Sequence, residues 1–386
     1  MRPPRTLTAL AVALAATVPS TAHANAPARP ARLQAALDGI IASGVPGAVA
    51  LTRKNGDTGL QARGVRNLKT RAKIRPDDRF RIGSGTKTFV ATVILQLVGE
   101  GRLRLKDDVG RRLPGEIVRG RKITVRHLLD HTSGLPDFSR DPRLLEPYDK
   151  DPAYYSPPRR LLSLVESEPL LFPPGTGFAY SNTNYVVLGL LIEKITGRSA
   201  SAEIHRRLIR PLSLRGTSLP VRDARIRGPH TRGHLTNVPG EGTVDVTELS
   251  PSIAWTSGGM ISTARDLARF QRALFSGRLL RPAQQRALKT IAAASDGYAL
   301  GVARADTPCG TAWGHGGAFP GYHSLAYTTA DGRRQAVIAI NTDRVLSETT
   351  YRRLDAAFEV ALCGKASPAS PSANGYSIRE SVGGGS

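Results

Sequence analysis

The sequence predicts an α/β (α+β) fold: an antiparallel sheet flanked by N- and C-terminal helices, with an all-helical domain inserted into it. Hairpin signals occur near both ends of the chain, Asn55-Gly56 and Asp331-Gly332, each between strand-like segments. Between about residue 102 and residue 258 the pattern is one of helices separated by Pro- and Gly-rich loops, without a convincing strand pair. With 386 residues, the chain is long enough for two such domains.

The first 24 residues have the features of a secretory signal. Arg2 and Arg5 supply positive charge, Leu7 to Val18 is apolar, and Ala22-His23-Ala24 is a small-residue cleavage site. No cysteine stands directly after that site, so a lipoprotein anchor is not indicated, and no later apolar run has the length of a membrane span. We therefore expect a secreted, extracellular protein without a membrane span.

The expected α/β domain comprises residues 31–85 and 259–363. Its first part holds an amphipathic helix, Arg32 to Ser43, and two strands, Gly47 to Lys54 and Thr58 to Val65. Its second part has a helix capped by Ser262-Thr263, which runs from Ala264 to Phe275 before Gly277. A short helix follows, and then come three expected strands and a last helix: Tyr298 to Ala305, His323 to Thr329, Arg334 to Asn341, and Leu346 to Leu362.

Residues 86–258 form the expected all-helical domain. It begins with a helix from Thr86 to Gly101 and continues with four shorter ones: Val125 to His131, Arg159 to Glu166, Tyr185 to Thr196, and Ala200 to Leu208. We expect the active site in the cleft between the two domains. Residues 364–386 are rich in Ser, Pro and Gly, and we expect them to be a disordered tail.

The formal net charge of +23 raises the question of an anionic partner. The arginines are scattered rather than clustered with aromatic residues, so we do not expect nucleic acid binding. The anionic cell wall is a candidate partner for an exported cationic protein, and an arginine-rich composition without any specific partner is the alternative. The sequence shows no Cys/His cluster with metal-ligand spacing and no phosphate loop, so we expect no metal and no cofactor. We expect a monomer.

The two cysteines, Cys309 and Cys363, suggest one disulfide, because exported chains with an even number of cysteines usually pair them. Two buried free thiols are the alternative.

Ser84-x-x-Lys87 is the motif with the clearest chemical meaning. It stands at the start of an apolar helical segment, and residues three apart share a face of a helix. A serine hydroxyl needs an adjacent base to act as a nucleophile, and a partly buried lysine loses proton affinity and can be that base. Taken alone, the motif also fits a helix cap followed by a solvated lysine, so it needs partner motifs.

Two later motifs supply such partners. Tyr180-Ser181-Asn182 lies in an expected loop, where a tyrosinate beside a lysine ammonium would carry protons and Asn182 would contact an amide substrate. Trp313-Gly314-His315-Gly316-Gly317 lies just before an expected strand, where His315 would bind a carboxylate or join the proton relay. For each motif a purely structural role is the alternative, and the remaining histidines, His131 among them, are assigned structural roles.

The order Ser-x-x-Lys, Tyr-x-Asn, His-x-Gly resembles that of the penicillin-recognising serine enzymes, from about Ala31 to Cys363. The similarity is greatest to secreted D-alanyl-D-alanine carboxypeptidases. The supporting stretches are Asp78 to Ser84, Leu95 to Val98, Ile123 to Arg126, Tyr180 to Asn184, Leu191 to Lys194, and the two Cys-Gly pairs.

The resemblance implies an acyl-enzyme mechanism. Ser84 would attack the carbonyl, Lys87 and Tyr180 would remove its proton, and Tyr180, linked to His315, would protonate the leaving nitrogen. The resemblance also assigns substrate-binding roles, with the amides of Ser84 and Ala318 holding the oxyanion. The substrate-binding residues it implies are Asn182, Trp255, Gly316, Gly317 and Ala318.

The implied function is that of a D-alanyl-D-alanine carboxypeptidase acting on peptidoglycan peptides and acylated by penicillin. A class C-like β-lactamase or an esterase is the first alternative, and a penicillin sensor without turnover is the second. The chain departs from the carboxypeptidases where they bind the substrate carboxylate: Ala303 stands at the position of an arginine, and Gly316 and Ala318 replace hydroxyl residues. Because Arg304 should point to the opposite face of its strand, we expect poor discrimination in favour of a free carboxylate.

Overall fold

The computed structural model describes residues 29–366 except 114, 116–121, 239, 296 and 343–346. The expected signal segment and residues 367–386 of the expected tail lie outside this part of the chain. No helix within the described residues is long and apolar enough to cross a membrane.

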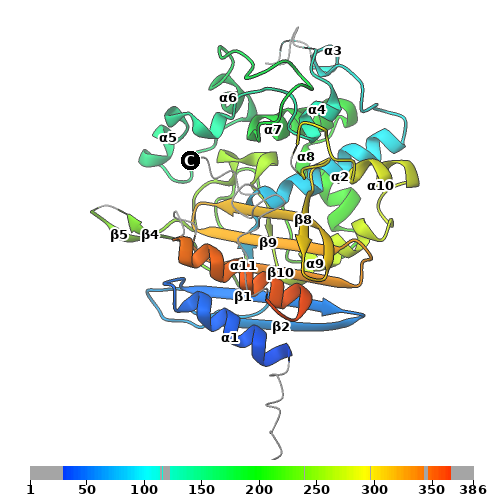
Figure 1. Cartoon of the computed structure of the whole chain (residues 1–386). Helices are drawn as coiled ribbons and strands as arrows, with labels where there is room; N and C mark the ends of the chain where they lie inside the picture. Colours follow the sequence, from blue (N-terminus) through cyan, green and yellow to red (C-terminus); the bar gives the residue numbers. More distant parts are fainter. Residues whose placement is uncertain are drawn as a thin grey trace, which may run out of the picture.

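A six-stranded antiparallel sheet with the strand order β2-β1-β10-β9-β8-β7 lies at the centre of the molecule (Figure 1). Residues from both ends of the chain share it, since Val49 of β1 pairs with Ala339 of β10. The fold class that the sequence predicts is therefore confirmed. The strands are β1 (Gly47–Lys54), β2 (Asp57–Gly64), β7 (Ala303–Thr307), β8 (Gly310–Phe319), β9 (Tyr322–Thr329) and β10 (Arg334–Ile340).

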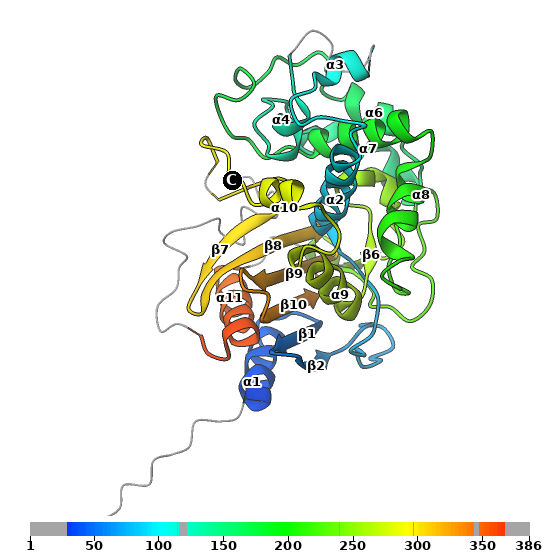
Figure 2. The same ribbon diagram turned by 90° about the vertical axis from the view of Figure 1, so that its right-hand side faces the viewer.

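Helices cover both faces of the sheet. The terminal helices α1 (Arg29–Ile41) and α11 (Glu348–Cys363) pack against each other and against one face, and α9 (Ala264–Phe275) packs against the other (Figure 2). On the first face, apolar side chains such as Leu37, Ile338 and Phe358 form one buried cluster, which stabilises the docking of the two terminal helices.

The remaining helices lie together beyond one edge of the sheet (Figure 1). The chief ones are α2 (Thr86–Gly99) and α7 (Asn182–Thr196). The shorter ones are α3 (Val109–Arg112), α4 (Val125–Leu129), α5 (Glu146–Lys150), α6 (Pro158–Ser163), α8 (Ala200–Ile204), a π-helical turn (His205–Ile209) and α10 (Pro282–Leu288).

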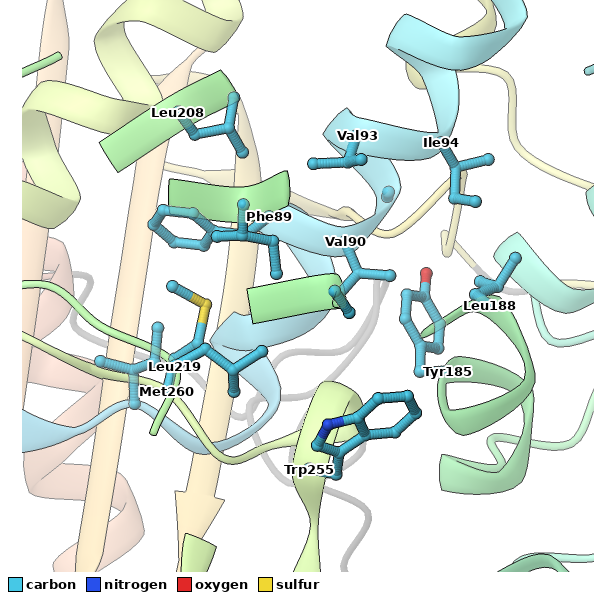
Figure 3. Packing of buried hydrophobic residues seen from close by; sticks show 14 of the residues in the cluster. Phe89, Val90, Val93, Ile94, Tyr185, Leu188, Leu208, Leu219, Trp255 and Met260 are labelled. Atoms are coloured by element: carbon cyan, nitrogen blue, oxygen red, sulfur yellow. The ribbon is translucent and has the colours of Figure 1, made fainter. Parts of the chain in front are cut away.

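Helix α2 is buried on nearly every side, which explains why it is so apolar. Its residues from Thr86 to Leu95 are all buried, and Figure 3 shows Phe89 and Val93 packed among residues of other segments. The ring of Phe89 also stacks on Phe270 of α9, with the ring centroids 3.7 Å apart. This packing holds the start of α2 rigidly between the helices and the sheet.

Three expectations about strands are wrong. A hairpin, β4 (His234–Val238) with β5 (Gly242–Asp245), lies within the region expected to be purely helical. The strand expected from Tyr298 begins only at Ala303, because the chain bends at Gly301, whose φ of +78° is left-handed. The third error is β8, which was not expected at all, because its run of glycines has low strand propensity.

A second two-stranded sheet connects the two parts of the molecule. In it β3 (Phe80–Arg81) pairs with β6 (Ile261–Ser262), immediately before the chain enters the turn that carries Ser84.

Candidate active site

Ser84 lies in a single 3-10 turn, Gly83–Gly85, between β3 and α2. The turn precedes the α-helix, so Ser84 stands just outside α2 and Lys87 is the second residue of it. Lys87 Nζ lies 3.0 Å from Ser84 Oγ. The structure thus brings together the two residues that the i, i+3 spacing pointed to.

Lys87 is fully buried, and its amine has three oxygen neighbours. Besides Ser84 Oγ these are Asn182 Oδ1 at 2.7 Å and the Ser257 carbonyl oxygen at 2.8 Å. Burial lowers the pKa of Lys87 to about 7, with Asp137 opposing the shift. A neutral amine donates two hydrogens and offers one lone pair, so it can donate to Asn182 and Ser257 while accepting the proton of Ser84.

Tyr180 has its hydroxyl buried beside this pair. Burial raises the pKa of Tyr180 well above its usual value, and the neighbouring Ser84 only partly opposes that shift. Lys87 Nζ lies over the ring of Tyr180, 4.8 Å from its centroid. The expected tyrosinate is therefore wrong for the resting site: Tyr180 is a neutral phenol, which can give a proton but not take one.

His131, assigned a structural role from the sequence, packs directly against Tyr180. The two rings stack with centroids 4.3 Å apart, and His131 Nδ1 accepts a hydrogen bond of 3.1 Å from the backbone N–H of Ser181. His131 is completely buried and has a left-handed φ of +60°. Such a backbone angle is uncommon for a residue other than glycine and often marks a functional position. The run His131-Thr132-Ser133-Gly134, shortly after α4, is the sequence signal that marks it.

Asn182 is the first residue of α7, and protein groups occupy all of its side chain. Its Oδ1 accepts from Lys87, while Nδ2 donates to Asp137 Oδ2 and Ser139 Oγ, both at 3.1 Å. Asn182 therefore holds the lysine in place in this state. Sequence analysis missed Asp137 and Ser139, because they lie more than 40 positions before Asn182 in the chain.

His315 lies inside β8 rather than before a strand, and both of its ring nitrogens are engaged. Nε2 is 2.9 Å from Tyr298 Oη, and Nδ1 contacts the Gly316 carbonyl oxygen. Burial lowers the pKa of His315 to about 3, so the ring is neutral: Nδ1 donates to Gly316 and Nε2 accepts from Tyr298. The expected hydrogen-bonded relay from His315 to Tyr180 is absent among the described residues, and the two ring centroids are 6.4 Å apart.

Two glycines let β8 approach the turn of Ser84. A Cβ on Gly317 would lie 2.0 Å from the Ile82 carbonyl oxygen, and one on Gly83 would lie 2.2 Å from the Ala318 carbonyl oxygen. Strand β7 pairs with β8 only as far as Gly314, so the stretch from His315 to Phe319 has no second partner among the described strands. This stretch, with Gly316, Gly317 and Ala318, forms a wall next to Ser84.

Trp255 is not on that wall. Its side chain is only 3 % exposed and packs in the core, where a Cβ added to Gly189 would touch it (Figure 3). The expectation that Trp255 contacts substrate is wrong, because the short helical turn that carries it directs the indole inward. The same turn, Trp255–Ser257, instead supplies the Ser257 carbonyl that holds Lys87.

The comparisons with known proteins agree with this arrangement. The family sequence model described as Beta-lactamase matches residues 30–360. The chain belongs to this beta-lactamase family. Among curated proteins of similar sequence, Penicillin-binding protein 4 of Amycolatopsis lactamdurans is 32% identical over 235 residues, 59% of each chain. Penicillin-binding protein 4* of Bacillus subtilis is 28% identical over 75% of this chain and 66% of its own. The chain thus spans less than two thirds of the length of both relatives.

Two solved structures match over nearly their whole length. A D-stereospecific amidohydrolase from Streptomyces sp. is 38% identical, covers 87% of this chain and 99% of its own, and has a TM-score of 0.79. A D-amino acid amidase from Ochrobactrum anthropi SV3, complexed with L-phenylalanine amide, is 26% identical, covers 86% and 97%, and has a TM-score of 0.75. The beta-lactamase-like fold and the superfamily predicted from the three motifs are confirmed.

The structure shows the position where the sequence departs from the D-alanyl-D-alanine carboxypeptidases. Ala303 is buried against Tyr180 and Phe178. The adjacent Arg304 is exposed and binds Asp306, with Nη2 2.7 Å from Oδ2. Neither residue offers a cation to a substrate at Ser84, as the sequence departure predicted.

The two cysteines form the expected disulfide. Cys309, between β7 and β8, is bonded to Cys363, the last residue of α11, with a Cα–Cα distance of 5.4 Å. The bond ties α11 to the strand that forms the wall next to Ser84. No group of three or more His, Cys, Asp or Glu that could hold a metal ion occurs in the described ranges.

Proposed function

We propose that this protein is a serine hydrolase that forms an acyl-enzyme on Ser84 and acts on amides or esters of D-configured acyl groups. The observation that carries the proposal is a nucleophile–base pair, Ser84 and Lys87, with a buried amine whose pKa is about 7. The position where the carboxypeptidases are expected to bind a carboxylate holds Ala303, and the adjacent Arg304 binds Asp306 instead. The similar structures named D-stereospecific amidohydrolase and D-amino acid amidase support the amide preference.

The first chemical step follows from the contacts of Lys87. Ser84 Oγ attacks the substrate carbonyl carbon while its proton moves to the neutral amine of Lys87. The charge that develops on the carbonyl oxygen is stabilised by the backbone N–H groups of Ser84 and Ala318, on the turn and on the facing wall. The close approach that Gly83 and Gly317 permit keeps these two segments at a short distance.

The leaving group departs with a proton from Tyr180, whose phenol is protonated at every physiological pH. Lys87 then passes its proton to the Tyr180 phenolate, which restores both groups to their starting states. Water attacks the acyl-enzyme while Lys87 accepts one of its protons, and Lys87 gives that proton to Ser84 Oγ as the ester bond breaks and the acid is released. The protons that are gained and lost balance over the cycle.

A D-alanyl-D-alanine carboxypeptidase is the second candidate. The sequence similarity to proteins named penicillin-binding protein favours it. It requires a group that binds the terminal carboxylate of the peptide. Ala303 and the outward Arg304 do not provide one, so we place this candidate second.

The deciding experiment compares kcat/KM for a peptide ending in D-Ala-D-Ala with kcat/KM for its C-terminal amide. A hydrogen bond to a charged group is worth about 1.5–3 kcal/mol, so a site built for the carboxylate would favour the acid by roughly 10- to 100-fold. We expect no such preference. A preference for the acid of about tenfold or more would contradict the proposal, and one above about a hundredfold would establish the carboxypeptidase.

Three further measurements with the same enzyme separate the remaining alternatives. Matched D- and L-amino acid amides test the stereochemical claim, which equal rates would contradict. A penicillin hydrolysed faster than the amides would indicate a β-lactamase, and a penicillin adduct that persists for hours without ester turnover would indicate a sensor. The Ser84→Ala variant is the control, and we expect it to lose both hydrolysis and covalent labelling.

A further inference from the structure

A pair of adjoining hollows lies away from the candidate active site. Their volumes are about 580 Å³ and about 310 Å³, and Arg79, Arg215 and Gly216 line both of them. Their lining includes Ile261 of β6 and residues from the start of α9. Figure 2 shows where these two elements lie in the fold. None of the residues assigned to catalysis above contributes to either wall. We call this pair of hollows the arginine groove.

Seven arginines and four aspartates line the arginine groove. Two of these aspartates form ion pairs with three of the arginines. Asp77 pairs with Arg265, and Asp223 pairs with both Arg225 and Arg227.

The other two aspartates are buried. Asp78 pairs with Arg66, which lies outside the groove, and Asp266 accepts hydrogen bonds from Gly216 N and Thr217 Oγ1. Four arginines of the groove therefore have no carboxylate partner within the described part of the chain: Arg75, Arg79, Arg215 and Arg269.

These four cations differ in how firmly they are held. Arg79 is half-buried: its guanidinium packs on Gly228, where an added Cβ would lie 2.3 Å from Nη1, and Nη2 donates to the Arg215 carbonyl oxygen at 3.4 Å. Arg269 donates to the carbonyl oxygens of Leu212 and Ser213. The side chains of Arg75 and Arg215 make no hydrogen bond or ion pair with any described residue and are exposed. The groove thus combines an ordered guanidinium at its centre with free ones at its edge.

We propose that the arginine groove binds an anionic polymer whose phosphodiester groups repeat along a flexible polyol chain. A guanidinium presents a planar fork that matches two phosphate oxygens, and several uncompensated ones in a concave surface favour an anion over a neutral ligand. Arg79 and Arg215 line both hollows, so a polymer chain that occupied both would meet these two arginines in each of them. The inference is independent of the reaction proposed for Ser84.

Two other polyanions fit the groove less well. Single-stranded nucleic acid binds to proteins by stacking its bases on aromatic side chains, and no aromatic residue lines the groove. An anionic membrane is flat and rewards apolar insertion, whereas the large apolar side chains that the described part exposes, Leu145 and Leu171, lie outside the groove.

The test measures binding of a short synthetic poly(glycerol phosphate) to the full chain. The test variant is the double substitution Arg75→Ser, Arg215→Ser, which breaks no described contact. The control, Arg333→Ser with Arg352→Ser, removes the same charge from two arginines whose side chains are 75% and 72% exposed elsewhere. Thermal melting verifies that both variants are folded.

We expect the groove variant to bind the polymer at least about tenfold more weakly, and the control to lose less than about threefold. The slope of log K against log salt should also become shallower by about one to two for the groove variant. An equal loss in both variants would mean that only the overall charge attracts the polymer and would overturn the proposal. Binding to an oligothymidylate or to anionic vesicles that is as tight as to the polymer would overturn the choice of ligand.

Discussion

Replacing Lys87 by methionine should change how the stability of the protein depends on pH. In the folded state the pKa of Lys87 is about 7, because burial disfavours the ammonium form, whereas in the unfolded chain it has the usual value near 10.5. Between these two pH values the unfolded chain binds a proton that the folded chain does not. The stability of the wild type therefore rises with pH through this window, by about 1.4 kcal/mol per pH unit.

The expected size follows from the same two pKa values. Across the full window the difference corresponds to about 5 kcal/mol, and between pH 7 and pH 9 it amounts to about 2 kcal/mol, because the folded state is still half protonated at pH 7. Methionine does not titrate, so the stability of the variant lacks this pH-dependent contribution. The loss of three hydrogen bonds in the variant shifts its stability at every pH and does not affect the slope.

Urea unfolding of both proteins at pH 7, 8 and 9 measures the difference directly. The exposed lysine variant Lys194→Met serves as the control, and its stability should run parallel to that of the wild type. Parallel curves for Lys87→Met as well would refute the lowered pKa. Activity provides a second readout: acylation by an ester should rise with pH around a midpoint near 7 in the wild type, and fall by about 10²- to 10⁴-fold in the variant.

Other substitutions test the architecture of the site. Gly317→Ala should push β8 away from the Ser84 turn. We expect it to lower the stability measured by urea unfolding by about 1–3 kcal/mol and to lower kcat/KM for an ester. The control Gly39→Ala, which has open space around it, should lower neither the stability nor kcat/KM. Replacing Cys309 and Cys363 by serine removes a cross-link between residues 54 positions apart in the sequence and should lower the free energy of unfolding by about 4 kcal/mol. Thiol titration of the wild type, denatured without reductant, should find no free thiol. His131→Asn, which tolerates the left-handed φ, should lower kcat with little change in KM because Tyr180 loses its stacking partner; an unchanged kcat would show that the stack is only structural.

The parts of the fold that sequence patterns predicted are those governed by local rules. Asn55-Gly56 and Asp331-Gly332 each join two strands at the expected place, and the helix expected from Ala264 to Phe275 has those bounds in the structure. Thr263 caps that helix through its side chain, and such caps depend only on neighbouring residues. The closeness of Ser84 and Lys87 was predictable for the same reason, because it depends only on one helical turn between residues three apart.

The parts that were missed depend on long-range contacts. Strand β8 contains four glycines and becomes a strand only because β7 and β9 pair with it on either side. The partner of His315 is Tyr298, a residue expected to lie in a strand but found in the bend before β7. Nothing near His315 in the sequence distinguishes Tyr298 from Tyr180 as that partner.

The pairing of β1 with β10 has a consequence for how the chain reaches its active form. Val49 and Ala339 are neighbours in the sheet, yet almost the whole chain must be synthesised before they can meet. Contacts of such sequence separation are slow to form, because a large loop must be closed before they contribute. The wall that faces Ser84 also comes late, since β8 begins only at Gly310. We therefore expect a growing chain to carry its nucleophile for most of its synthesis without the surface that makes it reactive, and to acquire acylating activity only in the last stage of folding.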